Sequence, residues 1–159
     1  MNNLLSGYSI NKEMIEIKKQ KILIFLLVLL IPVLTIPPII FRNTIGNDWA
    51  KIINIILTAT VGCYILWFIE NRYIQTKNKI TFFNTLTNAE DKTLEAIFSE
   101  ITEHTITYKK IECYVIDFKI NHVQRSVYLP IFLSIPKLLP NKKYQIIVAN
   151  NVLKGWYEL

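Results

Sequence analysis

The chain has 159 residues, of which 52% are hydrophobic, and its formal net charge is +6. Its mean hydropathy of +0.30 is too high for an ordinary soluble domain, and the apolar excess is concentrated before residue 70. The two cysteines, Cys63 and Cys113, lie in segments of different character, which excludes a disulfide scaffold and fits a reducing compartment.

Residues 1–21 are predicted to form a basic flank before the first apolar segment. They contain four lysines and the two acids Glu13 and Glu16, with too few apolar residues for a strong amphipathic anchor. The apolar run that follows is longer than the core of a signal peptide, and no small-residue cleavage site follows it. We therefore expect this run to remain in the protein as an anchor.

Two apolar segments, residues 22–41 and 52–69, predict a transmembrane hairpin. They contain 20 and 18 residues, without any Asp, Glu, Lys or Arg. A hydrocarbon core about 30 Å thick is spanned by roughly 20 helical residues, and a backbone in lipid must satisfy its own hydrogen bonds. Residues 22–70 are therefore expected to form two membrane-spanning helices joined by a short loop.

The basic residues near the ends of these segments predict the orientation of the hairpin. Four lysines precede the first segment and three basic residues follow the second, whereas the loop between the segments contains two. Basic residues are enriched on the cytoplasmic side of membrane proteins. Both termini are therefore expected in the cytoplasm, with the hairpin in the inner (plasma) membrane.

Prolines in the first span predict irregular helix geometry, and small residues in the second predict a helix-packing face. A kink is predicted near Pro32 and a broken last turn near Pro37, because proline removes a helical hydrogen bond. In the second span, a cluster of small residues would let another helix approach closely. This small-residue face consists of Thr58, Ala59, Thr60, Gly62 and Cys63. The approaching helix is either the first span of the hairpin or a helix of another molecule.

Residues 71–159 are predicted to form one cytoplasmic α+β domain, since 89 residues suffice for one small core but not for two. The segment 71–83 fits either a continuation of the second helix or a short strand. Thr87 and Glu90 have the spacing of a capping box, which marks the start of a helix.

The segment 88–103 is predicted to be an amphipathic helix. Its apolar residues recur at the spacing i, i+3, i+4 and i+7, which places them on one face. These residues are Leu94, Ile97, Phe98 and Ile101. We expect this face to be buried, with Phe98 in the core of the domain.

After His104 the apolar pattern changes to a period of two, which predicts strands. Proline cannot donate to a ladder, so Pro130 limits its strand to an edge or a bulge, and Asn150-Asn151 suits a tight hairpin turn. The expected fold is a four-stranded antiparallel meander of SH3-like or OB-like size, with a substantially buried Trp156 in the last strand. The predicted strands are residues 106–118, 123–133, 144–149 and 152–159.

Groups with catalytic or metal-binding potential are scarce. His104 and His122 lack the spacing to cysteines or acids that is typical of a zinc site or a catalytic triad, and Cys113 has no identifiable base. The four glycines form no phosphate-binding loop. We therefore expect no enzyme, no cofactor and no metal, and we assign no catalytic, cofactor-binding or metal-binding residue.

One charge asymmetry is compatible with a ligand. Residues 109–159 contain eight Lys or Arg against three acids. A structural interpretation is attraction to the acidic segment 88–103, with lysines protecting the sheet edges. The functional interpretations are contact with anionic lipid headgroups or capture of a phosphate-bearing ligand by basic and aromatic residues. The candidates for such capture are Lys110, Tyr114, Arg125, Tyr128 and Tyr144.

Two spans followed by a β-rich domain that closes with the hairpin segment from Lys142 to Leu153 resemble small uncharacterised bacterial membrane proteins with a C-terminal β-rich cytoplasmic domain. The same plan resembles the two-span, β-barrel effectors of bacterial anti-phage signalling. That resemblance implies a barrel that senses cyclic nucleotides and a membrane that is damaged on oligomerisation. It carries over no ligand residues.

Two functions from different classes follow as hypotheses, a membrane-tethered binding or scaffold module and a ligand-sensing effector that oligomerises through its transmembrane helices. A filled core without a pocket favours the module, whereas an open concave face lined by Arg125 and lysines favours the sensor. The expected partners are the lipid bilayer, a second copy or a partner membrane protein, and an anionic lipid or nucleotide. No DNA or RNA is expected.

Overall fold

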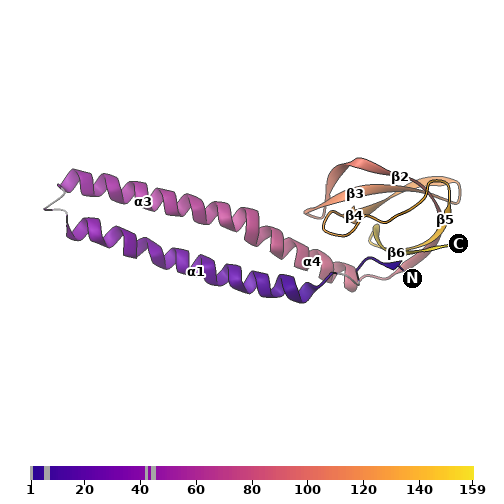
Figure 1. The fold of residues 1–159 in the computed structure, drawn as a ribbon, viewed down its shortest axis with the longest axis horizontal. Helices are drawn as coiled ribbons and strands as arrows, with labels where there is room; N and C mark the ends of the chain where they lie inside the picture. Colours follow the sequence, from indigo (N-terminus) through magenta and orange to yellow (C-terminus); the bar gives the residue numbers. More distant parts are fainter. Residues whose placement is uncertain (1, 6–7, 42, 44–45) are drawn as a thin grey trace. The chain divides into compact units, whose positions relative to one another are not determined.

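The structure is a computed structural model that describes residues 2–5, 8–41, 43 and 46–159 (Figure 1). The chain divides into two compact units, which are described separately. One unit contains Asn11–Lys77, and the other combines Met1–Ile10 with Asn78–Leu159.

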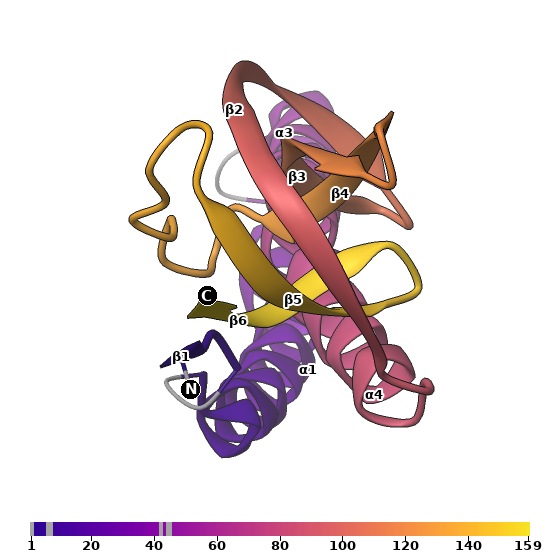
Figure 2. The same ribbon diagram turned by 90° about the vertical axis from the view of Figure 1, so that its right-hand side faces the viewer.

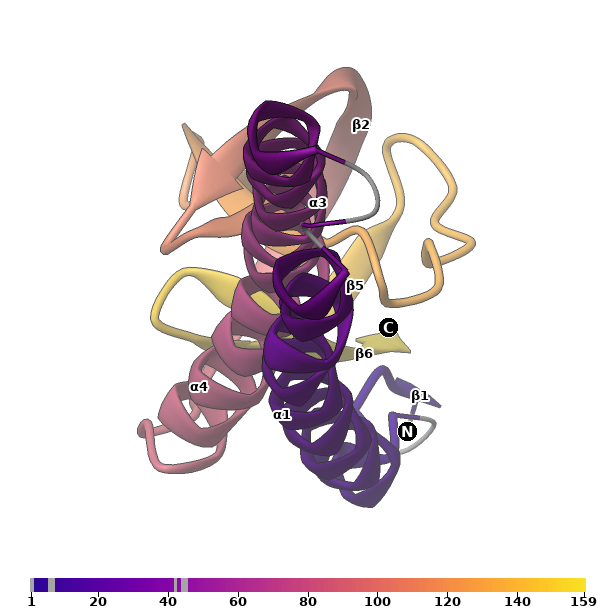
Figure 3. The same cartoon turned by 90° about the vertical axis from the view of Figure 1, so that its left-hand side faces the viewer.

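Two long helices make up most of the first unit and run side by side (Figures 1 and 3). Among the described residues, these two are long and apolar enough to cross a membrane, with mean hydropathies of 2.8 and 2.1 in their most apolar windows. The second continues without interruption through a π-helical turn, so the segment 71–83 is helical. The helices are α1 (Ile10–Ile40), α3 (Asn47–Phe68), η1 (Ile69–Ile74) and α4 (Gln75–Thr87).

The prolines of α1 do not end the helix where the sequence predicts. A broken last turn was expected near Pro37, but α1 continues to Ile40. The backbone N–H of Phe41 donates to the carbonyl of Pro37 at 2.9 Å, so the residues beyond the prolines still complete helical hydrogen bonds.

The second unit contains a mixed sheet that closes on itself (Figure 2). Within the described residues it has six strands in the order β1-β6-β4-β3-β2-β5, and β6 also pairs with β5. Five strands therefore form a ring, and β1 is added to β6. The bounds are β1 (Asn2–Asn3), β2 (Lys92–Tyr108), β3 (Ile111–Ile120), β4 (Val123–Pro130), β5 (Lys143–Ala149) and β6 (Val152–Glu158).

The amphipathic helix predicted over residues 88–103 is wrong, because this segment contains the start of β2. The strand pairs with β5 over Lys92–Ile97 and with β3 from Ile97 onward. A register shift after Phe98 moves the inward-facing position by one residue. Because of this bulge, the apolar residues of β2 do not alternate strictly, and their spacing resembles that of a helix. Thr87 is no helix start either, since its hydroxyl donates to the Phe83 carbonyl at the end of α4.

The four-stranded meander is also wrong. The predicted strand over residues 106–118 is interrupted by a turn at Lys109-Lys110, and the N-terminal flank contributes β1. The turn was missed because neither lysine is a residue that favours positive φ. The hairpin from β5 to β6 is confirmed, with φ of 50° at Asn150 and 59° at Asn151. Pro130 is the last residue of β4. Its missing backbone N–H therefore removes no hydrogen bond from the interior of the strand.

The ring of strands encloses a filled apolar core. Phe98 is 4% exposed, and its ring lies edge-on to Phe118 with 5.9 Å between centroids. Ile116, Leu129 and Ile146 are fully buried around them. Trp156 packs against this core but remains partly exposed. Phe98 is therefore a core residue as predicted, although it belongs to a strand.

The end of α4 covers a second apolar cluster. Phe82 and Leu86 of α4 are buried against Ile111, Cys113 and Val152. The segment that follows α4 is tied to β6, because the Lys154 ammonium lies 2.6 Å from the Asp91 carboxylate. This arrangement holds residues 88–91 against the strands and forms one wall of the cavity described next.

Candidate ligand cavity

A polar cavity of about 900 Å³ opens between the end of α4 and the strands. It lies beside the only bridge described between β4 and β6, which joins Tyr128 to Val152. Because these strands pair at a single point, the ring is weakly closed there. The lining comes from several separate segments and includes Asn88, Glu90, Lys92, Tyr108, Arg125 and Asn151.

Two basic side chains give the cavity its charge. Lys92 and Arg125 line it together with one acid, Glu90. Within the part of the chain that the structure describes, neither basic residue forms an ion pair. A guanidinium presents several donors in a plane and binds phosphate or carboxylate through two parallel hydrogen bonds. The cavity therefore suits a small anion.

The aromatic wall of the cavity is held in place by local contacts. The hydroxyl of Tyr108 donates to the carbonyl of Asn150 at 3.0 Å. The Tyr108 ring stacks on Tyr128 with 4.4 Å between centroids. These contacts fix the ring that lines the cavity and connect it to the turn between β5 and β6, so a ligand would meet a preformed surface.

Only Arg125, of the five residues predicted to capture a ligand, lines this cavity. Tyr128 lies behind Tyr108, and Lys110 is exposed in the turn between β2 and β3. Tyr144 is 2% exposed, and its hydroxyl accepts the backbone N–H of Leu139. Tyr114 packs against the core. The last two are structural residues.

Sequence reasoning missed Lys92, Tyr108 and Asn151 as cavity residues. Lys92 was assigned to the polar face of a helix that is a strand, and Asn151 was assigned only to a turn. No local signal could have grouped them, because sheet pairing and the α4 end bring them together from distant segments.

The cysteine and the two histidines singled out in the sequence of the distal unit lie in β3, in β2 and in a turn. Cys113 is fully buried, and this burial raises the pKa of its thiol to about 11, which disfavours the nucleophilic thiolate. His104 is exposed in β2, and His122 lies in the turn between β3 and β4. Among the described residues, no group of three His, Cys, Asp or Glu side chains could hold a metal ion.

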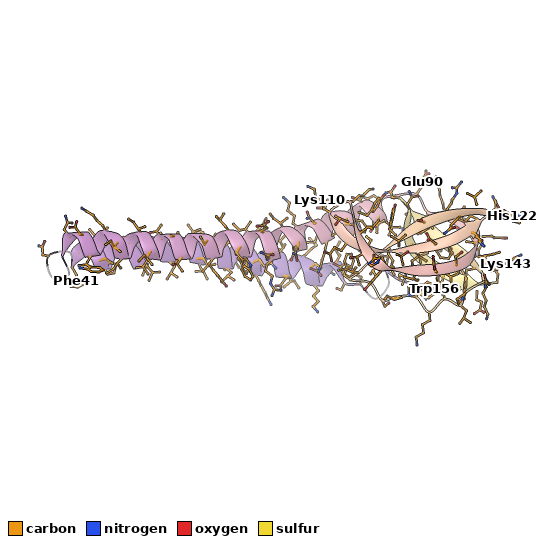
Figure 4. The ribbon with its side chains drawn as sticks, turned by 90° about the horizontal axis from the view of Figure 1, so that it is seen from above. Phe41, Glu90, Lys110, His122, Lys143 and Trp156 are labelled. Atoms are coloured by element: carbon orange, nitrogen blue, oxygen red, sulfur yellow. The ribbon has the colours of Figure 1, made fainter. Side chains whose placement is uncertain are left out.

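A smaller cavity of about 230 Å³ lies on the sheet near the turn between β3 and β4. Its lining includes Lys119, His122 and Lys143, with Glu95 as the acidic residue. Figure 4 shows His122 and Lys143 at the same end of this unit. Its volume is below the usual range for small-molecule sites, so the larger cavity is the stronger candidate.

The small-residue face of α3 does not contact the first span. Ala59, Thr60 and Cys63 are exposed, and a Cβ added to Gly62 would meet no other atom within 4 Å. These exposed positions leave room for another helix, which favours a helix of another molecule over the first span of the hairpin.

No protein-family model matches this chain, and no match was found among curated protein sequences.

Proposed function

We propose that this protein is a membrane-anchored binding module for a small anionic ligand. In this proposal α1 and α3 cross the inner (plasma) membrane, and the strand unit lies in the cytoplasm with both termini. The support is the length and hydropathy of the two helices and the excess of basic residues outside their connecting loop.

The observation that carries this proposal is Arg125 in the polar cavity, which forms no ion pair among the described residues. The cavity volume of about 900 Å³ lies within the range of small-molecule sites. Lys92 adds a second positive charge, and Tyr108, whose ring stacks on Tyr128, adds an aromatic side chain to the lining. Because the barrel core is filled, the ligand would bind at this opening rather than inside the ring.

Thermal unfolding of the full-length protein in detergent tests this proposal. A ligand that binds only the folded state raises the unfolding midpoint. A panel of nucleotides, cyclic nucleotides, sugar phosphates and inorganic phosphate should contain a compound that does so. Arg125→Gln should weaken its binding roughly tenfold to a hundredfold, as expected when a hydrogen bond to a charged group is lost.

Lys137→Gln is the matched control, because Lys137 is an exposed basic residue of the same unit that lines neither of the two cavities described. Its unfolding midpoint should rise with the ligand as in the unaltered protein. The proposal fails if no compound in the panel stabilises the protein, or if Arg125→Gln is stabilised to the same extent.

A ligand-sensing effector that oligomerises through its transmembrane helices is the second candidate. It is favoured by the open small-residue face of α3, where another helix can approach the backbone at Gly62. Cys63 is a free, exposed cysteine on this face and reports such an approach by disulfide cross-linking between molecules.

In membranes, cross-linking through Cys63 should increase when the stabilising compound is added. Gly62→Leu should reduce it by blocking close approach, without disturbing α1, since the space beside Gly62 is open. Cross-linking that is insensitive both to the compound and to Gly62→Leu would refute the effector and leave the binding module intact.

A further inference from the structure

The turn between β2 and β3 consists of two lysines in an unfavourable backbone conformation. Lys109 has a φ of 48° and Lys110 a φ of 66°, and both side chains are exposed. Left-handed backbone favours glycine and asparagine. The other two-residue hairpin turns in the described part of the chain each begin with asparagine, as Asn121-His122 and Asn150-Asn151. Conformational preference therefore does not account for the two lysines, whereas a role for their charge does.

An exposed apolar side chain lies beside this turn. Ile131 is 42% exposed, and its backbone N–H donates to the carbonyl of Glu112 at 3.0 Å, two residues after Lys110. The next residue, Phe132, lies under the ammonium group of Lys79 at 5.8 Å from the ring centroid. Three lysines, one isoleucine and the single acid Glu112 thus form a surface that is both basic and apolar.

This surface is connected to the predicted membrane span by a short helical segment. Lys79 follows Ile69, the last residue of the second apolar segment, by ten residues of continuous helix. At 1.5 Å per residue this length is at most about 15 Å. The headgroup layer adds several ångströms to each side of the hydrocarbon core. Lys79 is therefore tethered within about 15 Å of the end of the predicted span.

We propose that Lys109, Lys110 and Ile131 form a membrane-docking surface for the anionic phospholipids of the bilayer that α3 crosses. The lysines bind headgroup phosphates, and Ile131 enters the interface. An anionic bilayer matches both the positive charge and the exposed apolar side chain. The transmembrane helices of the same chain keep this surface close to the bilayer. The proposal rests on the membrane-anchoring part of the proposed function and is independent of the ligand cavity.

A fluorescent label at position 131 tests this docking in the full chain. Ile131→Cys in a Cys63→Ser background places one reactive cysteine on the surface, because Cys113 is fully buried. The protein carries an environment-sensitive dye there and is reconstituted into nanodiscs of phosphatidylcholine, with or without phosphatidylglycerol. We expect the emission to shift to the blue when phosphatidylglycerol is present.

The variant Lys109→Asn with Lys110→Gly removes both charges and keeps the turn, since these residues prefer its backbone conformation. It should weaken docking roughly 25-fold, the product of about fivefold for each lysine near an anionic surface. Val123→Cys is the control position, since Val123 is also exposed and follows His122, at the opposite end of the unit from Lys110 (Figure 4).

The proposal is overturned if positions 131 and 123 report the same emission in both bilayers, or if the shift at 131 persists in the double variant. A shift that follows the protein-to-lipid ratio instead of the anionic lipid assigns the surface to a second copy and also overturns it. Carbonate extraction of membranes tests the anchoring separately from the docking. A protein that resists extraction but shows no shift is anchored without docking, whereas an extracted protein contradicts the anchor itself.

Discussion

Gln20 of α1 and Thr76 of α4 form a buried hydrogen bond, with 3.2 Å between Nε2 and Oγ1. The two residues are 5% and 8% exposed. Thr76 in turn donates to the carbonyl of Arg72 at 2.9 Å. A polar contact of this kind fixes the register between two helices, because sliding either helix leaves a buried amide unpaired.

Thr76→Val should lower the free energy of unfolding by about 1 to 3 kcal/mol, since it leaves the buried Gln20 amide without this partner. Gln20→Leu combined with Thr76→Val should recover much of the loss, because both polar groups are then gone. Unfolding in detergent, with the four proteins of the double-mutant cycle, measures the coupling. Additive effects would show that the hydrogen bond contributes nothing to the register.

Phe98→Ala should lower the free energy of unfolding by about 3 to 5 kcal/mol, as aromatic truncations in cores do. Phe98 is 4% exposed and contacts Phe118 inside the ring of strands. Phe98→Leu keeps most of the buried volume and should cost clearly less. Chemical denaturation of the full-length variants measures both, and equal losses would argue against a packed site at this position.

The variant Lys109→Asn with Lys110→Gly should raise the free energy of unfolding by about 1 to 2 kcal/mol, because it relieves two lysines of positive φ. Lys142→Asn is a useful comparison. It removes a lysine that pairs with Glu158 and gains no such relief. Thermal unfolding in neutral detergent measures the effect apart from lipid binding. A loss of stability would mean that the lysines make contacts that outweigh their backbone strain.

The Cys113 thiol should make stability depend on alkaline pH. Burial raises the pKa of Cys113 from 9.0 to about 11 in the folded protein. The neutral thiol is therefore favoured by folding, so its contribution is complete below pH 9 and is lost as the pH rises towards about 11. Two pKa units correspond to a loss of about 2 to 3 kcal/mol.

Cys113→Ala isolates this effect, because other groups titrate equally in both proteins. The difference in free energy of unfolding between the two should shrink across that pH interval, measured by urea denaturation. A difference that stays constant would mean that the thiol is not desolvated in the folded state. At neutral pH, alkylating reagents should leave Cys113 intact until the protein unfolds.

The sequence by itself determined those features that depend on neighbours along the chain. Two uncharged apolar segments imply two long helices, and Asn150-Asn151 implies the turn from β5 to β6, because asparagine tolerates positive φ wherever it stands. Phe98 was placed in the core from a helical apolar face. It is buried even though the segment is a strand, because a large apolar side chain tends to be buried in either element.

Only the tertiary structure decided whether that segment is a helix or a strand. Pairing of β2 with both β3 and β5 supplies hydrogen bonds that local spacing cannot reveal, and the register shift after Phe98 disguises the period of two. The same holds for the cavity. Lys92, Tyr108 and Arg125 are far apart in the sequence, and they meet because the strands close into a ring beside the end of α4.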